Sequence, residues 1–205
     1  NLRYRLPMYD DASKLRARAL RRLPESQQRI IGRKIFRRPW LNRLATRALL
    51  AIEWAVPTDE VILAEVRKHD PDLIIVSPLV DFGSDQVDYI KAGHDLGIAT
   101  ALVVNSWDNL TNKGLMRVVP DRVYVWNETQ LREAVEYHSA PANSVEVTGA
   151  PNYDRWFERQ PSVSAEDFQR CAGLDPQQPY LLYLCSSPFI AEHEYEFVQQ
   201  WIAAV

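Results

Sequence analysis

The pattern of apolar and polar positions changes near residue 70. Before it, apolar residues recur every three or four positions, which predicts helices over residues 11–23, Gln27–Arg38, Leu41–Val56 and 58–69, the last capped by Thr58. The third is the clearest, because one apolar stripe runs along it while Arg43 and Arg47 lie off the stripe. The stripe consists of Leu41, Leu44, Ala45, Ala48, Leu49, Ile52, Ala55 and Val56.

After residue 70, short apolar runs alternate with helical patterns. Strands are predicted at Leu73–Leu79, which we expect to be buried on both faces, and at Ile98–Val104, Arg122–Trp126 and Val145–Thr148. Helices are predicted over Asp85–Leu96, capped by Ser84, and over Glu128–His138, capped by Asn127 with Gln130 in a capping-box position. This alternation predicts an α/β fold, a Rossmann-like parallel sheet flanked by helices with right-handed crossovers.

The remaining residues contain fewer elements. Glu158–Ala165 has the composition of a linker, and a helix near Ala165–Ala172, a strand at Tyr180–Cys185 and a helix over about Ala191–Ala204 follow it. One strand between two helices cannot close a core, so these elements either extend the first sheet or begin an incomplete second domain. The predicted organisation is a basic helical segment (1–57), a Rossmann-like α/β domain (58–157), a linker (158–165) and the start of a second α/β domain (166–205).

The densest group of polar side chains follows the second predicted strand. Residues 105–114 read N-S-W-D-N-L-T-N-K-G, and ligands of open α/β sheets bind at the carboxyl ends of the strands. We therefore expect ligand-binding residues here, namely Ser106, Trp107, Asp108, Asn109 and Lys113. The alternative is a well-capped loop whose Trp fills the core.

Polar residues also follow the other strands. Ser84 lies in the loop Val80–Gln86, where it and the first amides of the next helix suit an anion, although a simple N-cap explains it equally. Asn127 and Glu128 follow the third strand, and Asp154 follows a bend after the fourth. In a parallel sheet all these loops leave the same edge, so we expect a shared crevice. His138 ends a helix, where either a protonated imidazole or a packing role is expected.

Motif spacing excludes several chemistries. The seven glycines form neither G-x-G-x-x-G nor a P-loop, no two histidines have the spacing of a zinc protease, and G-x-S-x-G is absent. Asp70-Pro71-Asp72 is formally a D-x-D metal motif, but it precedes a strand, where ordinary turn chemistry explains it. We therefore expect neither a metal nor another cofactor. Cys171 and Cys185 fit no metal or redox spacing, and no apolar run is long enough to span a bilayer, which favours a cytoplasmic protein.

Charge is distributed unevenly. Residues 1–50 carry 14 Lys and Arg against three Asp and Glu, whereas the whole chain has a net charge of −3. A basic segment of this kind suits an anionic membrane surface or an acidic face of its own protein. No nucleic-acid motif accompanies it, so nucleic acid is not expected as a partner.

Three stretches in series resemble a known family. N-S-W-D-N-L-T-N-K-G (105–114), P-D-R-V-Y-V-W-N-E-T-Q-L-R-E-A (120–134) and V-T-G-A-P-N-Y-D-R-W-F (147–157) are similar to the N-terminal half of GT-B-fold glycosyltransferases of the surface-carbohydrate and capsule type. These are relatives of glycerophosphate polymerases and of non-hydrolysing UDP-GlcNAc 2-epimerases. The resemblance covers roughly residues 70–190, and Ser139 stands where the family usually has Gly after the matching His.

The resemblance implies two Rossmann-like domains that face each other across a cleft. The N-terminal domain would take a carbohydrate acceptor, and the C-terminal domain, begun by Cys171–Val205 and continued beyond it, would hold most of a nucleotide-sugar donor. The expected activity is metal-independent sugar transfer. No catalytic base is assigned. An epimerase of the same fold, or a non-catalytic binding or assembly module, remains an alternative.

Overall fold

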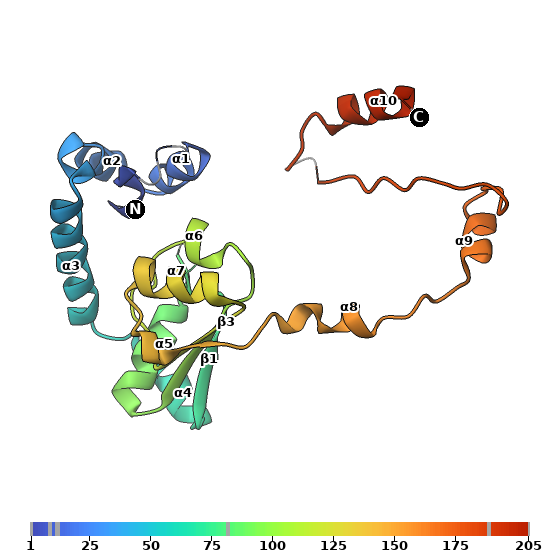
Figure 1. Cartoon of the computed structure of the whole chain (residues 1–205). Coiled ribbons are helices and arrows are strands. Elements are labelled where there is room, and N and C mark those ends of the chain that lie inside the picture. The colour runs from blue at the N-terminus through green and yellow to red at the C-terminus, as the bar shows by residue number, and fades with distance from the viewer. Residues whose placement is uncertain (1, 8–9, 11–12, 81–82, 188–189, 205) are drawn as a thin grey trace. The chain divides into compact units, whose positions relative to one another are not determined.

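The computed structural model describes residues 2–7, 10, 13–80, 83–187 and 190–204. The chain divides into two compact units, residues 1–154 and 155–205, which are described separately here (Figure 1). The helices of the first unit are α1 (Ser13–Arg21), α2 (Glu25–Ile31), α3 (Pro39–Ala55), α4 (Glu60–His69), α5 (Gln86–Leu96), α6 (Asn109–Asn112) and α7 (Glu128–His138). Among the described residues they are accompanied by the short 3-10 helices η1 (Leu2–Arg5), η3 (Lys34–Arg37), η4 (Ala142–Ser144) and η5 (Pro151–Tyr153).

The first unit is α/β, with a four-stranded parallel sheet flanked by helices in a Rossmann-like arrangement. Its strands are β1 (Leu73–Val76), β2 (Ala99–Val103), β3 (Arg122–Val125) and β4 (Val145–Val147), and they pair in the order β1-β2-β3-β4. The register aligns Val76 with Leu102, Leu102 with Val123 and Val123 with Val145. Because every pair is parallel, the loops after all four strands leave one edge of the sheet, which we call the carboxyl edge.

The hydrophobic core lies on one face of this sheet. Side chains of Ile74, Val76 and Leu102 pack there against α4, α5 and α7. The expectation that the first strand is buried on both faces is wrong, because Leu73 and Ile75 are exposed and Ile75 retains 60% of its accessible surface. The topology explains this difference. Strands that pair in sequence order through right-handed crossovers carry all their connecting helices on the same face.

Caps begin the helices close to the predicted positions. Asn127 Oδ1 accepts the backbone N–H groups of Thr129 and Gln130, as expected. Two details, at α4 and α7, were predicted wrongly. The N-cap of α4 is Asp59 rather than Thr58, whose hydroxyl donates to Asp95 at 2.6 Å. Gln130 does not complete a capping box, because its side chain is used between loops of the carboxyl edge.

The basic segment is joined to the sheet through the end of α3. Lys91 of α5 is buried and donates to the carbonyl oxygens of Glu53 (3.3 Å) and Val56 (2.5 Å), which satisfies acceptors at the α3 C-terminus. The Glu53 carboxylate also accepts from Arg117 at 2.9 Å, and the Trp54 ring stacks on His94 with centroids 5.6 Å apart. α3 is therefore fixed by its C-terminal turn.

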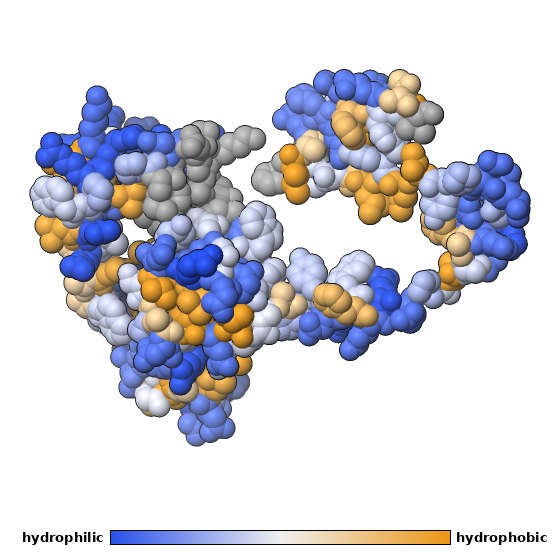
Figure 2. All heavy atoms as spheres, viewed as in Figure 1, coloured by the Kyte–Doolittle hydropathy of each residue, from blue (hydrophilic) through white to orange (hydrophobic). Residues whose placement is uncertain are grey.

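The second unit has little internal packing. It contains α9 (Ala165–Cys171) and α10 (Glu194–Ala204), while α8 (Asp154–Glu158) lies at the boundary between the units. The predicted strand over Tyr180–Cys185 is not formed. An isolated strand needs a neighbour for its backbone hydrogen bonds, and the described residues of this unit provide none. Leu181, Leu182 and Leu184 are consequently exposed, and hydrophobic surface is visible on this unit in Figure 2.

No helix among the described residues is long and apolar enough to cross a membrane.

Candidate ligand-binding edge of the sheet

Hydrogen bonds join the loops that leave the carboxyl edge. Asn152, after β4, donates from Nδ2 to Oδ1 of Asn105, after β2, at 3.1 Å. Gln130 of α7 donates from Nε2 to the carbonyl oxygen of Ser106 at 3.1 Å, and its Oε1 accepts the Trp126 N–H at 2.8 Å. The loops after β2, β3 and β4 therefore form one connected structure.

The loop 105–114 is braced by its own asparagine. Asn109 begins α6, and its Oδ1 accepts the backbone N–H groups of Asn105 (3.1 Å) and Ser106 (2.9 Å). The Asn109 side chain is buried, with 4% of its surface exposed. The Ser106 hydroxyl donates to Asp108 at 2.6 Å. Asn109 thus acts within the loop, and its amide oxygen is not available to a ligand.

Trp107 stands out from this braced loop. Its side chain is 72% exposed, so the alternative in which the Trp fills the core is wrong. Trp126 behaves differently, since it is half-buried, donates from Nε1 to the Val104 carbonyl at 2.8 Å and meets the Tyr153 ring edge-on. Of these two Trp residues at the carboxyl edge, Trp107 alone presents most of its ring to solvent.

Lys113 ends the same loop. Its backbone carbonyl accepts a hydrogen bond from the Tyr4 hydroxyl, which ties η1 of the basic segment to the carboxyl edge. The side chain is half-buried, and its ammonium group has no hydrogen bond or ion pair with the residues that the structure describes. Within the described structure, a cation close to Trp107 in sequence is therefore without an anionic partner.

His138 holds the far end of this region in place. It is buried at the end of α7, Nδ1 accepts the Met116 N–H at 2.9 Å and Nε2 lies 2.8 Å from the Leu110 carbonyl. Since an N–H points at Nδ1 and a carbonyl faces Nε2, the geometry requires the neutral tautomer with the proton on Nε2. The packing alternative describes His138 better than the protonated imidazole does.

The other predicted residues lie on the carboxyl edge, but no hydrogen bond or ion pair among the described residues joins them to Trp107. Ser84 accepts the Gln86 N–H at 3.2 Å as part of the turn into α5, whose N-cap position is Asp85. Asp81 and Phe82 of that loop lie outside the described residues. Asn127 is used as a cap, whereas Glu128 and Asp154 are exposed. A crevice shared by these loops stays a prediction.

A metal ion has no evident place in the described part of the chain. No group of three His, Cys, Asp or Glu side chains lies within reach of one ion there. Asp70 and Asp72 precede β1 and so lie at the amino edge of the sheet, opposite the candidate site, with Asp70 in the left-handed conformation that ends α4.

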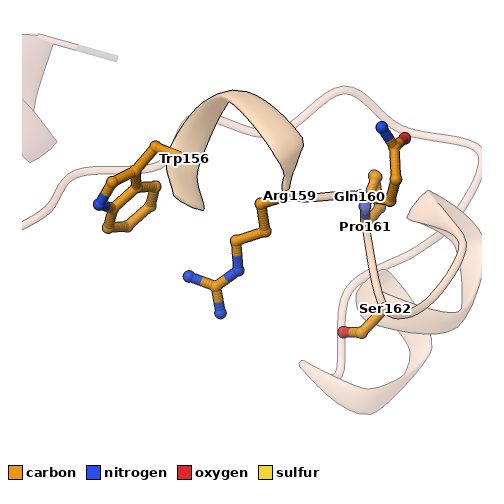
Figure 3. Close-up of a pocket in the computed structure, with 5 residues that line it drawn as sticks. All are labelled: Trp156, Arg159, Gln160, Pro161 and Ser162. Carbon is orange, nitrogen blue, oxygen red and sulfur yellow. The ribbon is translucent and has the colours of Figure 1, made fainter. Parts of the chain in front are cut away.

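The second unit contains a shallow hollow of its own. Trp156, Arg159, Gln160, Pro161 and Ser162 line it (Figure 3). All five are exposed and come from seven consecutive positions, and the Arg159 guanidinium lies 5.3 Å from the Trp156 ring centre. It is a bend in one segment rather than a site built from several elements.

Three residues of the edge were missed as functional candidates: Gln130, Asn152 and Tyr4. Gln130 and Asn152 lie in the stretches 120–134 and 147–157, so their proximity to the ends of predicted strands could have identified them. Nothing in the sequence pairs Tyr4 with Lys113, which are 109 positions apart.

Comparison of the chain with protein-family models, curated protein sequences and solved structures finds no match in any of the three.

Proposed function

We propose that the first unit is the acceptor-side domain of a metal-independent GT-B sugar transferase, which transfers a sugar from a nucleotide-sugar donor to a surface carbohydrate. The sequence resemblance of residues 105–157 motivates the proposal, and the parallel α/β sheet is compatible with it. The free, exposed Cys171 and Cys185 agree with a reducing cytoplasm, in which we expect the reaction to occur.

The observation that carries the proposal is the exposure of Trp107 on a braced loop. A large ring exposed to water is useful when a ligand covers it, and the apolar face of a sugar ring packs well on an indole. The loop is held by Asn109, so the indole is presented at the carboxyl edge without the ordering cost of a mobile loop.

Lys113 and Asp108 supply the polar part of this site. Lys113 would meet a phosphate or carboxylate, because its ammonium group has no partner in the described structure. The Asp108 carboxylate, oriented by the Ser106 hydroxyl, would accept hydrogen bonds from sugar hydroxyls. In metal-independent transfer, basic side chains and helix N-termini stabilise the leaving diphosphate.

His138 is not placed to serve as an acid or base of an epimerase. An epimerase needs acid and base groups aimed at a sugar carbon, and both ring nitrogens of His138 are engaged by the backbone. Backbone N–H groups also occupy the amide oxygens of Asn109 and Asn127, so a ligand contact of either residue would use its amide NH2 group.

Calorimetric titration of the whole chain with nucleotide sugars and a panel of oligosaccharides tests the proposal. Trp107→Ala should weaken oligosaccharide binding roughly three- to tenfold, the range expected for loss of one ring contact. Its melting temperature should not change, because the side chain is exposed. Trp156→Ala removes a comparably exposed indole in the second unit and should leave binding intact.

Two results would count against the proposal. If no oligosaccharide or nucleotide sugar binds the folded chain, the binding or assembly module becomes the better description. If Trp107→Ala lowers the melting temperature and binding together, the indole is structural. Lys113→Ala should behave as Trp107→Ala does, with weaker binding of the phosphate-bearing ligands and little change in stability. Product analysis with and without acceptor then separates transfer from epimerisation.

A further inference from the structure

One apolar face of α3, here called the Trp40–Leu44–Ile52 stripe, is largely uncovered, and it shares Leu44 and Ile52 with the stripe expected from the sequence. Trp40, Leu44 and Ile52 keep 62%, 59% and 59% of their surface exposed, although an amphipathic helix ordinarily buries this stripe in a core. Exposed Ala48 and Ala51 lie between Leu44 and Ile52, and exposed Ala55 follows, at three- and four-residue spacing. Along α3, hydrophobic and hydrophilic surface lie side by side in Figure 2.

Most of the contacts that fix α3 come from other sides of the helix. The exception is Trp54, which stacks on His94 and lies two turns after Arg47, at the border of the stripe. Asn42 is buried and donates from Nδ2 to the carbonyl oxygens of Leu2 (2.7 Å) and Phe36 (2.9 Å). Glu53, which lies eleven positions further on and so shares the Asn42 face, bonds to Arg117 at 2.9 Å. With this face used for docking, the Trp40–Leu44–Ile52 stripe remains exposed to solvent.

Basic side chains border the stripe. Arg43 and Arg47 each lie three residues after a stripe residue, Trp40 and Leu44, and are therefore its neighbours on the helix surface. Both are exposed and have no ion pair among the described residues. No acidic residue occurs from Ser26 to Ile52, whereas this span also contains Arg29, Arg33, Lys34, Arg37 and Arg38.

We propose that α3 lies flat on an anionic membrane surface. The Trp40–Leu44–Ile52 stripe would enter the boundary between headgroups and acyl chains, and Arg43 and Arg47 would meet lipid phosphates. Trp40 at the beginning of the helix suits the interfacial zone, where Trp is enriched. The 17 residues of α3 extend about 26 Å along such a surface.

The distribution of charge favours an anionic lipid surface, rather than a second copy of the chain, as the partner of the stripe. Residues 51–205 carry 10 Lys and Arg against 24 Asp and Glu, so an anionic surface repels that part of the chain and attracts the basic segment. A second copy seated on the stripe would bring Arg43 and Arg47 of both copies together, which opposes such a dimer.

Vesicle sedimentation of the whole chain tests this proposal without reference to sugar transfer. At low salt the chain should sediment with mixed phosphatidylglycerol–phosphatidylcholine vesicles and not with phosphatidylcholine alone. Arg43→Gln with Arg47→Gln should lower the partition coefficient about 30-fold, from the usual contribution of a basic residue near an anionic surface. Leu44→Asp should remove binding while both arginines remain.

The matched control replaces two exposed arginines outside the basic segment, Arg67→Gln with Arg132→Gln, and should leave vesicle binding within twofold of the unmodified chain. All variants change exposed side chains, and unchanged melting curves verify folding. Absence of sedimentation with anionic vesicles overturns the proposal. So does equal binding by the Arg43/Arg47 variant and its control, or a concentration-dependent dimer that Leu44→Asp dissociates.

Discussion

Replacing Asn109 by Ala tests whether the loop after β2 is held by its own side chain. Asn109 Oδ1 accepts the N–H groups of Asn105 at 3.1 Å and Ser106 at 2.9 Å, and the side chain is 4% exposed. The substitution leaves both N–H groups without this acceptor, and an unsatisfied buried donor costs about 1–3 kcal/mol. Because water reaches part of the loop, we expect a total loss of roughly 2–4 kcal/mol in the free energy of unfolding.

Asn109→Asp is the matched control. Its carboxylate keeps an acceptor where the N–H groups of Asn105 and Ser106 point, and a charged acceptor forms stronger hydrogen bonds. Repulsion from the adjacent Asp108 partly offsets this gain. We therefore expect a stability within about 1 kcal/mol of the unmodified chain.

Urea unfolding followed by far-UV circular dichroism measures both variants. The reasoning is refuted if Asn109→Ala unfolds at the same urea concentration as the unmodified chain, or if Asn109→Asp loses as much stability as Asn109→Ala. If Asn109→Ala keeps its stability but loses oligosaccharide binding, Asn109 contacts the ligand directly, as the sequence first indicated.

Two further predictions concern the amino edge of the sheet. Gly93→Ala should destabilise the chain by about 1–3 kcal/mol in thermal unfolding, because a Cβ there would clash with Thr100 Cγ2 and lie 3.3 Å from Ile74 Cδ1. Adding Thr100→Ser to this variant should recover most of the lost stability. A Gly93→Ala variant as stable as the unmodified chain would show that α5 can shift. The hydrogen bond from the Thr100 hydroxyl lowers the pKa of Asp121 below its usual 3.8. The ionised carboxylate therefore stabilises the fold above about pH 4. This contribution is lost as the pH falls through the lower pKa of the folded state. Melting temperatures measured down to pH 3 should therefore fall less steeply for Asp121→Asn, and identical slopes would contradict this assignment.

The alternation of strands and helices was enough to predict the sheet. Its four strands and the helices α5 and α7 lie within a few residues of the expected bounds, because buried β-branched runs and caps such as Asn127 are local signals. The exposed face of β1 was not predictable from that strand alone. The run Leu73–Val76 is apolar at every position, and only the strand order reveals that one face receives no helix.

The failure at Tyr180–Cys185 has a related cause. That segment has the composition of a buried strand, but strand formation requires a partner, which no local pattern supplies. The amphipathic pattern of α3 shows the same limit for a helix, because the pattern does not reveal what covers the apolar face. Its stripe was visible in the sequence, yet its exposure depends on Asn42 and Glu53 docking a different face.

At the carboxyl edge, the density of polar residues located the region but could not separate braces from binding groups. Asn109 and Trp107 are two positions apart and were equal candidates. They differ in their contacts. Two backbone N–H groups donate to Asn109 Oδ1, whereas the Trp107 side chain is exposed to solvent. A polar side chain that is hydrogen-bonded to the backbone of its own loop fixes the conformation of that loop. The fixed loop then holds an exposed neighbouring side chain in a defined orientation. Loss of binding without loss of stability should therefore be found at Trp107 and Lys113, and loss of both at Asn109.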